Sequence, residues 1–429
     1  MSFDIFDIPI IDTHEHLPDE SHRTQKEKDV LFLFFSHYAS TDIANAGLAR
    51  TIIAKLRDST IPIEARWTQL EPYWQKISNT TYAQVLKIAA RDLYGINQIN
   101  SETIADLADK VKAASKVGLY REVFNKANIK WAIVNDPDYL YDPNILYETP
   151  VPRPSDPPGL FKKVINARAL IYIRNKDQFP YLLEILGYPI IHSFTDWLVL
   201  LESFFIKSSD VVAIKFPHGY DFSLATLKPT FYEAEQVFNH LFFSPYQEES
   251  INHQESQPLQ DYLIHFVIQQ AVKHNLPIQV HTGLLEGSYN NLQNANPLHL
   301  IPLLMEYKEA RFVLFHGSYP WIREFIALGK MFPNVWLDLC WVWAISPQAG
   351  RILLSEIIET IPQNKVTAFG GDYLFIEGTY GHSVLARRNI QLVLENKIKE
   401  GWFGVDEAKQ YAKSILYSNA LELYKPIMY

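Results

Sequence analysis

Histidine and aspartate side chains of the kind that bind metal ions follow several apolar segments of this chain. The first group lies in residues 12–16, which read DTHEH and come directly after an Ile-Pro-Ile-Ile run. Alternate residues of a β-strand point to one face, so His14 and His16 should project together, and Asp12 could orient one of their rings. Two imidazoles at this spacing can hold one metal ion.

Three further residues of the same kind occur late in the chain, again at the ends of apolar runs. His281 precedes Thr-Gly, His316 precedes Gly, and Asp372 follows Gly-Gly. A carboxylate at position 372 could bind the metal and take a proton from metal-bound water. The alternatives are a buried structural histidine at 281 and a turn or helix-capping aspartate at 372. Ligand residue types that recur at strand ends predict a metallo-enzyme built on a barrel.

Short β-branched apolar runs predict the strands that would position these residues. Most of the runs are separated by helix-like segments, so the sequence predicts an α/β protein, a (β/α)8 TIM barrel. The predicted strands cover residues 8–13, 129–134, 164–173, 211–216, 277–281, 311–316, 334–339 and 366–370. The predicted barrel helices cover residues 195–207, 260–274, 298–307, 320–331, 348–361, 383–398 and 406–423.

A long segment between the first two predicted strands, residues 18–128, is predicted to be a helical insertion within a single barrel that spans residues 1–429. Its predicted helices cover residues 26–37, 42–46, 63–77, 82–93, 101–116 and 119–126. Because the insertion leaves from the strand end that carries His14 and His16, we expect it to form a cap over the metal. The aromatic motif in residues 66–74 has helical spacing, which favours core packing of this cap over ligand binding.

Two later segments have irregular patterns. Residues 143–158 are rich in proline and predict an extended loop. Residues 216–253 predict a second lid element with a helix near residues 231–241.

Together these motifs resemble the amidohydrolase superfamily, and within it the branch that includes domains fused to glutamine-synthetase-like proteins. That family carries His-x-His on the first strand, Lys or Glu on the fourth, His on the fifth and sixth, and Asp on the eighth. The resemblance spans nearly the whole chain, which offers a residue for each slot: His14, His16, Lys215, His281, His316 and Asp372. Residues 66–74, 91–95, 281–283, 296–298 and 334–338 also match motifs of this branch.

The resemblance implies a metal-dependent hydrolase that cleaves an amide, ester or lactone bond of a small molecule. A divalent ion, expected to be zinc, would be held by His14, His16, His281 and Asp372 and would lower the pKa of its water. Asp372 would accept the proton, and His316 would polarise the scissile carbonyl or hold a second ion. A second ion would require Lys215 to be carbamylated; otherwise Lys215 forms an ion pair or meets an anionic substrate.

Residues that follow the predicted strands are candidates for substrate contact. The principal candidates are His218, Tyr220, Glu286 and Trp341, and weaker ones are Arg168, Arg174, Tyr289 and Trp343. His382 and the Arg387–Arg388 pair are expected to cap a helix or lie at the surface. The remaining histidines, His37 among them, are expected to be structural or superficial.

Other functions remain open on the same scaffold. Relatives of this branch decarboxylate aromatic acids or isomerise sugar acids with the same ligands, and a barrel of this kind can also serve as an idle binding module. A Rossmann or phosphate-loop protein is excluded because no G-x-G-x-x-G or G-K-[ST] motif follows a predicted strand. Cys340 lacks a recognisable histidine partner for nucleophilic catalysis.

Composition limits the partners and the compartment. The formal charge of −9 argues against nucleic-acid binding. The single cysteine excludes an internal disulfide and suits a reducing compartment. The first residues are acidic rather than basic, and no apolar stretch reaches the roughly 18–20 residues of a spanning helix. We therefore expect a cytoplasmic enzyme with a small-molecule substrate, without nucleic-acid or membrane partners; homo-oligomer formation stays open.

Overall fold

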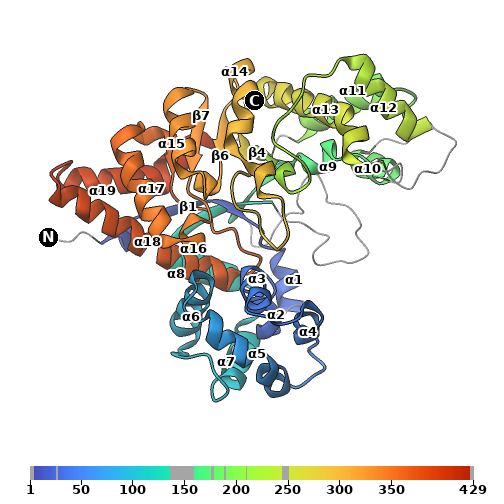
Figure 1. Ribbon diagram of the computed structural model, residues 1–429. Coiled ribbons are helices and arrows are strands. Elements are labelled where there is room, and N and C mark those ends of the chain that lie inside the picture. The colour runs from blue at the N-terminus through green and yellow to red at the C-terminus, as the bar shows by residue number, and fades with distance from the viewer. Residues whose placement is uncertain are drawn as a thin grey trace.

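Eight parallel strands form one sheet in chain order, from β1 to β8, as in a (β/α)8 barrel. Figure 1 shows the computed structural model, which describes residues 4–25, 28–135, 159–174, 178–187, 190–208, 210–243 and 251–425. The strands are β1 (Ile10–Glu15), β2 (Ile129–Val134), β3 (Phe161–Asn166), β4 (Val211–Phe216), β5 (Ile278–Val280), β6 (Phe312–Leu314), β7 (Val335–Asp338) and β8 (Val366–Thr367). The predicted fold class is confirmed.

The tip of β1 is joined to the segment that follows β8 by backbone hydrogen bonds. The amide of Thr13 donates to the carbonyl of Phe369 at 3.1 Å, and the amide of His16 donates to the carbonyl of Tyr373 at 3.1 Å. Between these two, the amide of Asp372 donates to the carbonyl of His14 at 2.9 Å. The first and last strands of the barrel are therefore held together where the candidate metal ligands lie.

The prediction for the third strand was wrong in its second half. Strand β3 ends at Asn166, and the chain continues as the short helix α9 (Arg168–Ile171) rather than as strand to residue 173. The Asn166 side chain accepts a hydrogen bond from the amide of Arg168, which turns the chain at this point. Leu170 and Ile171 are buried in the helix as they would be in a strand. A short apolar run does not separate these two structures by its periodicity.

Helices cover the outside of the sheet, and two of them begin seven residues earlier than predicted, at His253 rather than 260 and at Ile376 rather than 383. The barrel helices are α10 (Gln178–Leu186), α11 (Phe194–Lys207), α12 (Phe231–Phe243), α13 (His253–Lys273), α14 (Ile301–Glu306), α15 (Ile322–Met331), α16 (Val342–Ile345), α17 (Pro347–Thr360), α18 (Ile376–Lys399), α19 (Val405–Lys413) and α20 (Asn419–Leu423). None of the described helices is long and apolar enough to cross a membrane.

The early start of α18 corrects the prediction for His382 and Arg387, which are fully buried rather than at a helix cap or the surface. The Nδ1 atom of His382 lies 2.9 Å from the carbonyl oxygen of Gly371. The Arg387 guanidinium donates to the carbonyls of Ile5, Ile8 and Ala127. Arg388 is exposed, as expected.

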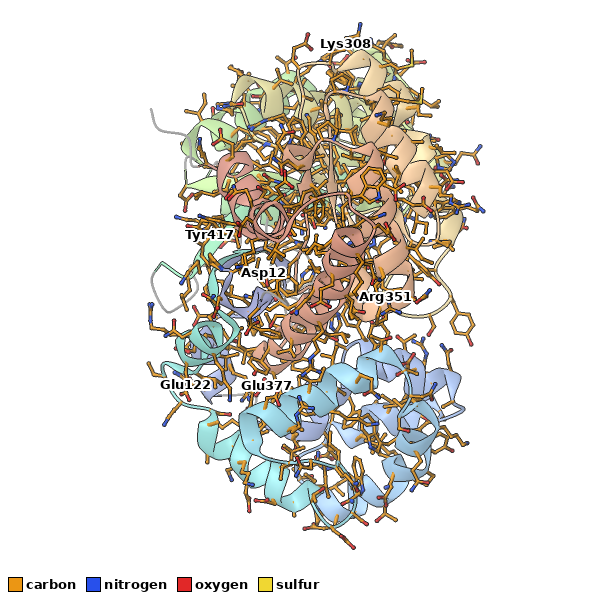
Figure 2. All side chains as sticks on the ribbon, turned by 90° about the vertical axis from the view of Figure 1, so that its left-hand side faces the viewer. Asp12, Glu122, Lys308, Arg351, Glu377 and Tyr417 are labelled. Carbon is orange, nitrogen blue, oxygen red and sulfur yellow. The ribbon has the colours of Figure 1, made fainter. Side chains whose placement is uncertain are left out.

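Eight helices lie between β1 and β2, and Figures 1 and 2 show them gathered at one side of the barrel. They are α1 (Glu20–Gln25), α2 (Val30–Phe35), α3 (Tyr38–Asn45), α4 (Arg50–Leu56), α5 (Ile63–Ile77), α6 (Thr81–Tyr94), α7 (Ile104–Ala114) and α8 (Leu119–Ala127). Trp67 and Trp74 are buried in their core, and Arg66 forms an ion pair with Asp29 at 2.7 Å. The aromatic motif of residues 66–74 is thus packing, as predicted, whereas α1 and α4 were not predicted.

A buried ion pair joins these helices to the barrel. Helix α6 packs along α18, and Glu377 of α18, labelled in Figure 2, pairs with Arg23 of α1 at 2.7 Å. The hydroxyl of Tyr94 also donates to the Glu377 carboxylate at 2.6 Å. Breaking such a buried pair from one side is strongly destabilising, so this contact should fix the insertion against the barrel.

Two sequence predictions concern segments that are described only in part. The proline-rich residues 143–158 lie outside the described residues. Of residues 216–253, the structure describes a single turn at His218–Tyr220 and helix α12, which matches the helix predicted near residues 231–241.

Candidate metal centre

A cavity of about 270 Å³ lies where the strand ends and the helical insertion meet. Its walls come from the ends of several strands, from their loops, and from the segment between α2 and α3. The lining residues are His14, His16, Ser36, His37, Tyr38, Asn135, Arg168, Lys215, Pro217, Tyr220, His281, Glu286, Asp372 and Leu374.

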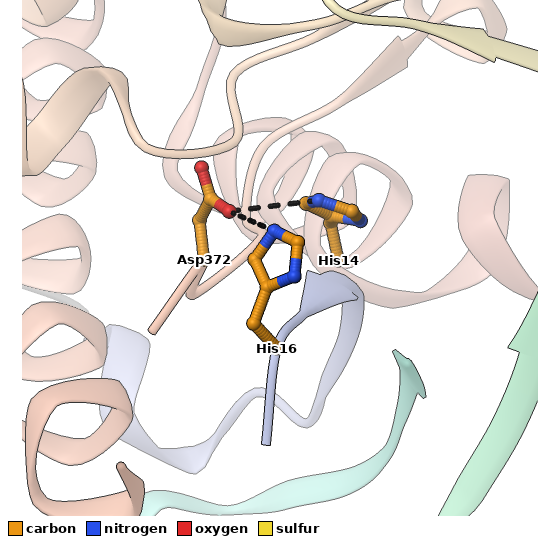
Figure 3. A group of neighbouring side chains, drawn as sticks. All are labelled: His14, His16 and Asp372. Atoms are coloured by element: carbon orange, nitrogen blue, oxygen red, sulfur yellow. Dashed lines mark ion pairs between the residues drawn. The ribbon is translucent and has the colours of Figure 1, made fainter. Parts of the chain in front are cut away.

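Three of these side chains converge in the manner of metal ligands (Figure 3). The Oδ1 atom of Asp372 lies 3.5 Å from Nε2 of His14 and 3.2 Å from Nε2 of His16. Ligand atoms about 2.0–2.1 Å from a tetrahedral zinc ion lie about 3.3 Å from one another. The spacing of the three donor atoms therefore fits a single ion between them.

Hydrogen bonding fixes which nitrogen of His16 is available. Its Nδ1 atom lies 2.5 Å from the carbonyl oxygen of Asn135. A carbonyl only accepts, so Nδ1 carries the proton and Nε2 keeps its lone pair toward Asp372. A ring held in this way is pre-organised to bind a metal ion through Nε2.

The backbone around Asp372 is closely confined. Asp372 has a positive φ of 59°, and a Cβ atom on the preceding Gly371 would lie 1.8 Å from an Oε1 atom of Glu15. The Asp12 carboxylate accepts from the amides of Gly371 at 3.0 Å and His14 at 3.1 Å. Glu15 accepts from the amide of Tyr373 at 2.9 Å. Asp12 therefore fastens the backbone and does not orient an imidazole ring, which corrects the prediction for this residue.

The carboxyl groups of this region differ in their charge. Burial raises the pKa of Asp12 to about 7, and burial together with the charge of Asp12 raises the pKa of Glu15. Burial would also raise the pKa of Asp372, but the neighbouring imidazoles of His16, His14 and His316 hold it well below its usual value. Asp372 is thus the carboxylate that stays ionised at the cavity, as a metal ligand or a proton acceptor requires.

A second pair of imidazoles lies beside this group. His281 has its Nε2 atom 2.8 Å from the carbonyl of Leu284, and His316 has its Nδ1 atom 3.3 Å from the carbonyl of Cys340. The other two nitrogens, Nδ1 of His281 and Nε2 of His316, face each other at 3.0 Å. At this distance either ring can donate its N–H to the other ring; with both protons on the carbonyl-bonded nitrogens, the two lone pairs could instead hold a cation between them.

A shared proton is the less suitable cation here. Burial lowers the pKa of His316 to about 3, and burial together with the charge of His316 lowers the pKa of His281 well below its usual value. Both rings therefore favour the neutral form that binds metals. The sequence placed His281 with His14, His16 and Asp372, whereas the structure places it directly against His316 in the same cavity.

The two groups are linked through the Asp372 carboxylate. Its Oδ1 atom faces His14 and His16, while its Oδ2 atom lies 3.8 Å from Nδ1 of His316. His316, Cys340 and Asp372 also form a group with metal-binding spacing. The sequence did not single out Cys340 as a ligand; burial raises the pKa of its thiol, which disfavours the thiolate.

Lys215 lies next to the first group. Its Nζ atom is 3.3 Å from Nε2 of His14 and 4.1 Å from the centre of the Phe315 ring. Burial lowers the pKa of the Lys215 amine to about 8. A substantial fraction of neutral amine near this pH is the form that carbamylation requires.

The four principal candidates for substrate contact divide into two pairs. Tyr220 and Glu286 line the cavity. His218 is instead buried between Phe216 and Phe222, and Trp341 is buried behind His316 with its ring edge-on to that imidazole at 5.3 Å. Neither His218 nor Trp341 is among the lining residues, which corrects the prediction that they contact substrate.

The weaker candidates have similarly mixed placements. Arg168 lines the cavity and forms a two-point ion pair with Asp221 at 2.7 and 2.8 Å. Arg174 donates to the carbonyl of Ile251. Tyr289 is 99% exposed, and Trp343 is buried.

Sequence reasoning missed the residues that the insertion contributes. His37 lines the cavity and is buried, and its Nδ1 atom has no hydrogen-bond partner among the described residues. Burial lowers the pKa of His37 to about 3. The hydroxyl of Tyr38 donates to the carbonyl of Asp372 at 2.6 Å. The sequence feature that could have indicated these residues is the Ser-His-Tyr sequence directly after the apolar run of α2, which lies outside the strand-end motifs of the barrel.

Comparison with known proteins matches the C-terminal part of the chain to a known family. Residues 253–425 match the family model described as amidohydrolase. Protein fluG of Emericella nidulans is 32% identical over 177 residues, which cover 40% of this chain and 20% of fluG. The matched region thus represents about a fifth of the length of that curated relative.

Solved structures that cover nearly the whole chain share its fold. The uronate isomerase of Thermotoga maritima has a TM-score of 0.75 at 15% identity, over 98% of this chain and 95% of that one. The glucuronate isomerase of Caulobacter crescentus has a TM-score of 0.74 at 18% identity, over 99% and 92%. A protein of Lactobacillus casei described as a metal-dependent hydrolase has a TM-score of 0.60 at 17% identity, over 99% and 98%.

Proposed function

We propose that the chain is a metal-dependent hydrolase of the amidohydrolase superfamily that acts on a small molecule; its match to the amidohydrolase family model over residues 253–425 and its barrel support this. The bond it cleaves is an amide, ester or lactone bond. The observation that supports this most is the Asp372 carboxylate between the Nε2 atoms of His14 and His16, in a cavity of about 270 Å³.

We assign His14, His16 and Asp372 as the residues that hold the divalent ion, which we expect to be zinc. When bound, this ion supplies Lewis-acid chemistry that activates water and polarises a carbonyl. His281 and His316 offer two further neutral nitrogens beside it. One ion would satisfy the first group, and carbamylation of Lys215, 3.3 Å from His14, would provide the extra carboxylate for a second.

Asp372 is the proton acceptor in this proposal. Its carboxylate is ionised and faces the cavity, so it can take a proton from the attacking water. The amide of Asp372 donates to His14, and its carbonyl accepts from Tyr38, so its backbone is held from the barrel and from the insertion. Such fixed positioning is what general-base catalysis requires.

The tautomer of His316 favours one of its two expected roles. Its Nδ1 atom lies 3.3 Å from the carbonyl of Cys340, and the tautomer with the proton on Nδ1 leaves a lone pair on Nε2. That lone pair can hold a cation or accept a hydrogen bond from water, but it cannot donate to a substrate carbonyl. We therefore favour His316 as a ligand or a water-positioning residue over its role in polarising the carbonyl.

Isomerisation of a sugar acid is the second candidate function. The uronate and glucuronate isomerases cover this chain almost completely, with its insertion, at TM-scores of 0.75 and 0.74. In addition, Ser36, His37 and Tyr38 of the insertion line the cavity, where they could contact the hydroxyls of an extended substrate. An idle barrel is less well supported, since the ligand-type side chains converge on one cavity.

Product analysis separates the two candidates. The protein would be stripped of metal with a chelator, reloaded with zinc, and incubated with N-acyl amides, esters, lactones and glucuronate. The hydrolase proposal expects zinc-dependent release of a carboxylic acid from at least one of the first three classes. Conversion of glucuronate to a ketose, without hydrolysis of any acyl compound, would overturn it in favour of the isomerase.

A further inference from the structure

We propose that Glu286 hydrogen-bonds the leaving group of the cleaved bond and gives it a proton. This inference rests on the proposed hydrolase function and extends it, because it names a second acid–base residue and the side of the cavity at which the leaving group lies. Glu286 follows β5 in the loop after His281 and lines the same cavity as His14, His16 and Asp372.

The backbone of Glu286 is fixed on both sides. Its amide donates to the hydroxyl of Tyr220 at 3.0 Å, and its carbonyl accepts from the side chain of Asn290 at 2.7 Å. The Tyr220 ring in turn packs against the ring of His281, with the ring centres 4.8 Å apart. Glu286 is thus positioned relative to the candidate metal ligands through Tyr220.

Its carboxyl group is the part that the protein leaves available. No hydrogen bond or ion pair joins the Glu286 carboxyl to another described residue. The other acidic groups near the site are engaged: Asp372 with the imidazoles, Asp12 and Glu15 with backbone amides, and Asp221 with Arg168. A half-buried carboxyl that faces a cavity without a protein partner is suited to bind a donor or a basic atom of a ligand.

The environment of the Glu286 carboxyl favours its protonated form. Burial raises its pKa, and the negative charge of Asp372 raises it further, against the opposing effects of His16, Arg50 and Arg57. A protonated carboxyl that faces the cavity can give its proton to a leaving group there.

The protons balance over one turnover of amide hydrolysis. The water oxygen bonds to the carbonyl carbon as Asp372 takes one water proton. The carbon–nitrogen bond then breaks, its electron pair stays on the leaving nitrogen, and the Glu286 carboxyl protonates that nitrogen. Asp372 releases its proton to solvent and Glu286 takes one up, so the products are a carboxylic acid and an amine.

A leaving-group comparison tests this role on the zinc-loaded protein. The probes are a nitrophenyl ester, whose leaving group departs as a stable phenolate, and an anilide of the same acyl group, whose nitrogen must be protonated. Glu286→Gln should lower kcat/KM for the anilide about 10²–10³-fold and that for the ester less than about threefold, since general-acid catalysis contributes on this scale. The matched control is Glu309→Gln, at an exposed residue that precedes β6. This substitution should change neither kcat/KM value.

Two measurements besides turnover complete the test. Zinc content should be equal in wild type and Glu286→Gln, and aniline should raise the Tm of metal-free wild-type protein more than that of the variant. An equal loss on both probes, or no loss on the anilide, would overturn the assignment of Glu286 while leaving the hydrolase intact. Failure of the wild-type protein to release a carboxylic acid from any amide, ester or lactone of the product screen would overturn the hydrolase function itself.

Discussion

The two histidine groups of the cavity, at β1 and β8 and at β5 and β6, are built by the same means but differ in one respect. In each group a backbone carbonyl holds a ring nitrogen, as Asn135 does for His16 and Leu284 does for His281, whereas the Nδ1 atom of His14 has no partner among the described residues. At β1 and β8 the free nitrogens meet an ionised carboxylate; at β5 and β6 they meet each other. Because of this carboxylate, we propose the first group as the principal metal site.

The two groups also differ in how their backbones are secured. At β1 and β8, the buried carboxyls of Asp12 and Glu15 bind the amides on either side of Asp372. At β5 and β6, hydroxyl groups secure the backbone. The Thr282 hydroxyl donates to the carbonyl of Phe315 and lies 2.7 Å from the hydroxyl of Ser318. The two buried carboxyls of Asp12 and Glu15, the carboxyl clamp, secure the group that we expect to carry the ion and the base. Substitutions in the first group should therefore lower zinc binding and turnover more than substitutions in the second.

The largest expected effect separates the two groups directly. His14→Ala should lose bound zinc and with it all turnover, because it removes one of the three donors that cluster at β1 and β8 among the described residues. His281→Ala should keep zinc with an affinity lowered about 10–100-fold, the scale reported for residues that support a metal site. Zinc titration of both metal-free variants, with circular dichroism as the folding control, gives the result. Equal zinc affinity in the two variants would show that the group at β1 and β8 is not the principal zinc site.

Asp372→Asn should lower turnover about 10²–10⁴-fold, the usual contribution of a general base, and lower zinc affinity much less. The amide keeps one oxygen near His14 and His16 but cannot accept a proton. The measurement pairs zinc content with kcat on any substrate that the product screen identifies. Near wild-type turnover at full zinc occupancy would move the base to His316 or Lys215.

Gly371→Ala tests the clamp beneath the first group. The new methyl would lie 1.8 Å from Glu15 and must displace it, which should cost about 1–3 kcal/mol of unfolding free energy and weaken zinc binding. Gly404→Ala is the matched control, since its Cβ would meet Glu407 at 3.7 Å without a clash. Chemical denaturation measures both. If Gly371→Ala is as stable as the control, the carboxyl clamp is not as rigid as described.

The smallest expected effect is the contribution of Lys215 to the pH dependence of the free energy of unfolding. Burial lowers the pKa of its amine from 10.5 to about 8 in the folded state. Between these values the unfolded state binds more protons, so stability should rise with pH through this window. In metal-free Lys215→Met that contribution should disappear. Denaturation at pH 8 and pH 10 gives the difference, and an unchanged rise in the variant would assign it to another group.

The sequence predicted the barrel and its ligand residues because the strands are short apolar runs that end in polar residues of one chemical kind. His14, His16 and Asp372 could be found in this way, although their mutual distances depend on the contact of β1 with the segment after β8. His37 could not, because it reaches the cavity through the packing of the insertion on the barrel, which no local pattern encodes. His218 was misplaced for a related reason: its strand-end position was right, but its ring packs against Phe222.

The covering role of residues 18–128 also stays a prediction, supported by Ser36, His37 and Tyr38 at the cavity wall. Deleting the insertion would test it poorly, since the buried pair of Arg23 and Glu377 joins it to the barrel. His37→Ala is the milder probe: zinc content should stay unchanged while KM for the identified substrate rises.

The most direct test of the principal metal site is anomalous diffraction at the zinc edge from crystals of zinc-loaded protein. If His14, His16 and Asp372 hold the ion, a peak should appear about 2.0–2.2 Å from Nε2 of His14, Nε2 of His16 and a carboxylate oxygen of Asp372. A second peak should appear only where Lys215 is carbamylated. A single peak bound by His281 and His316, with none between His14 and His16, would contradict the account.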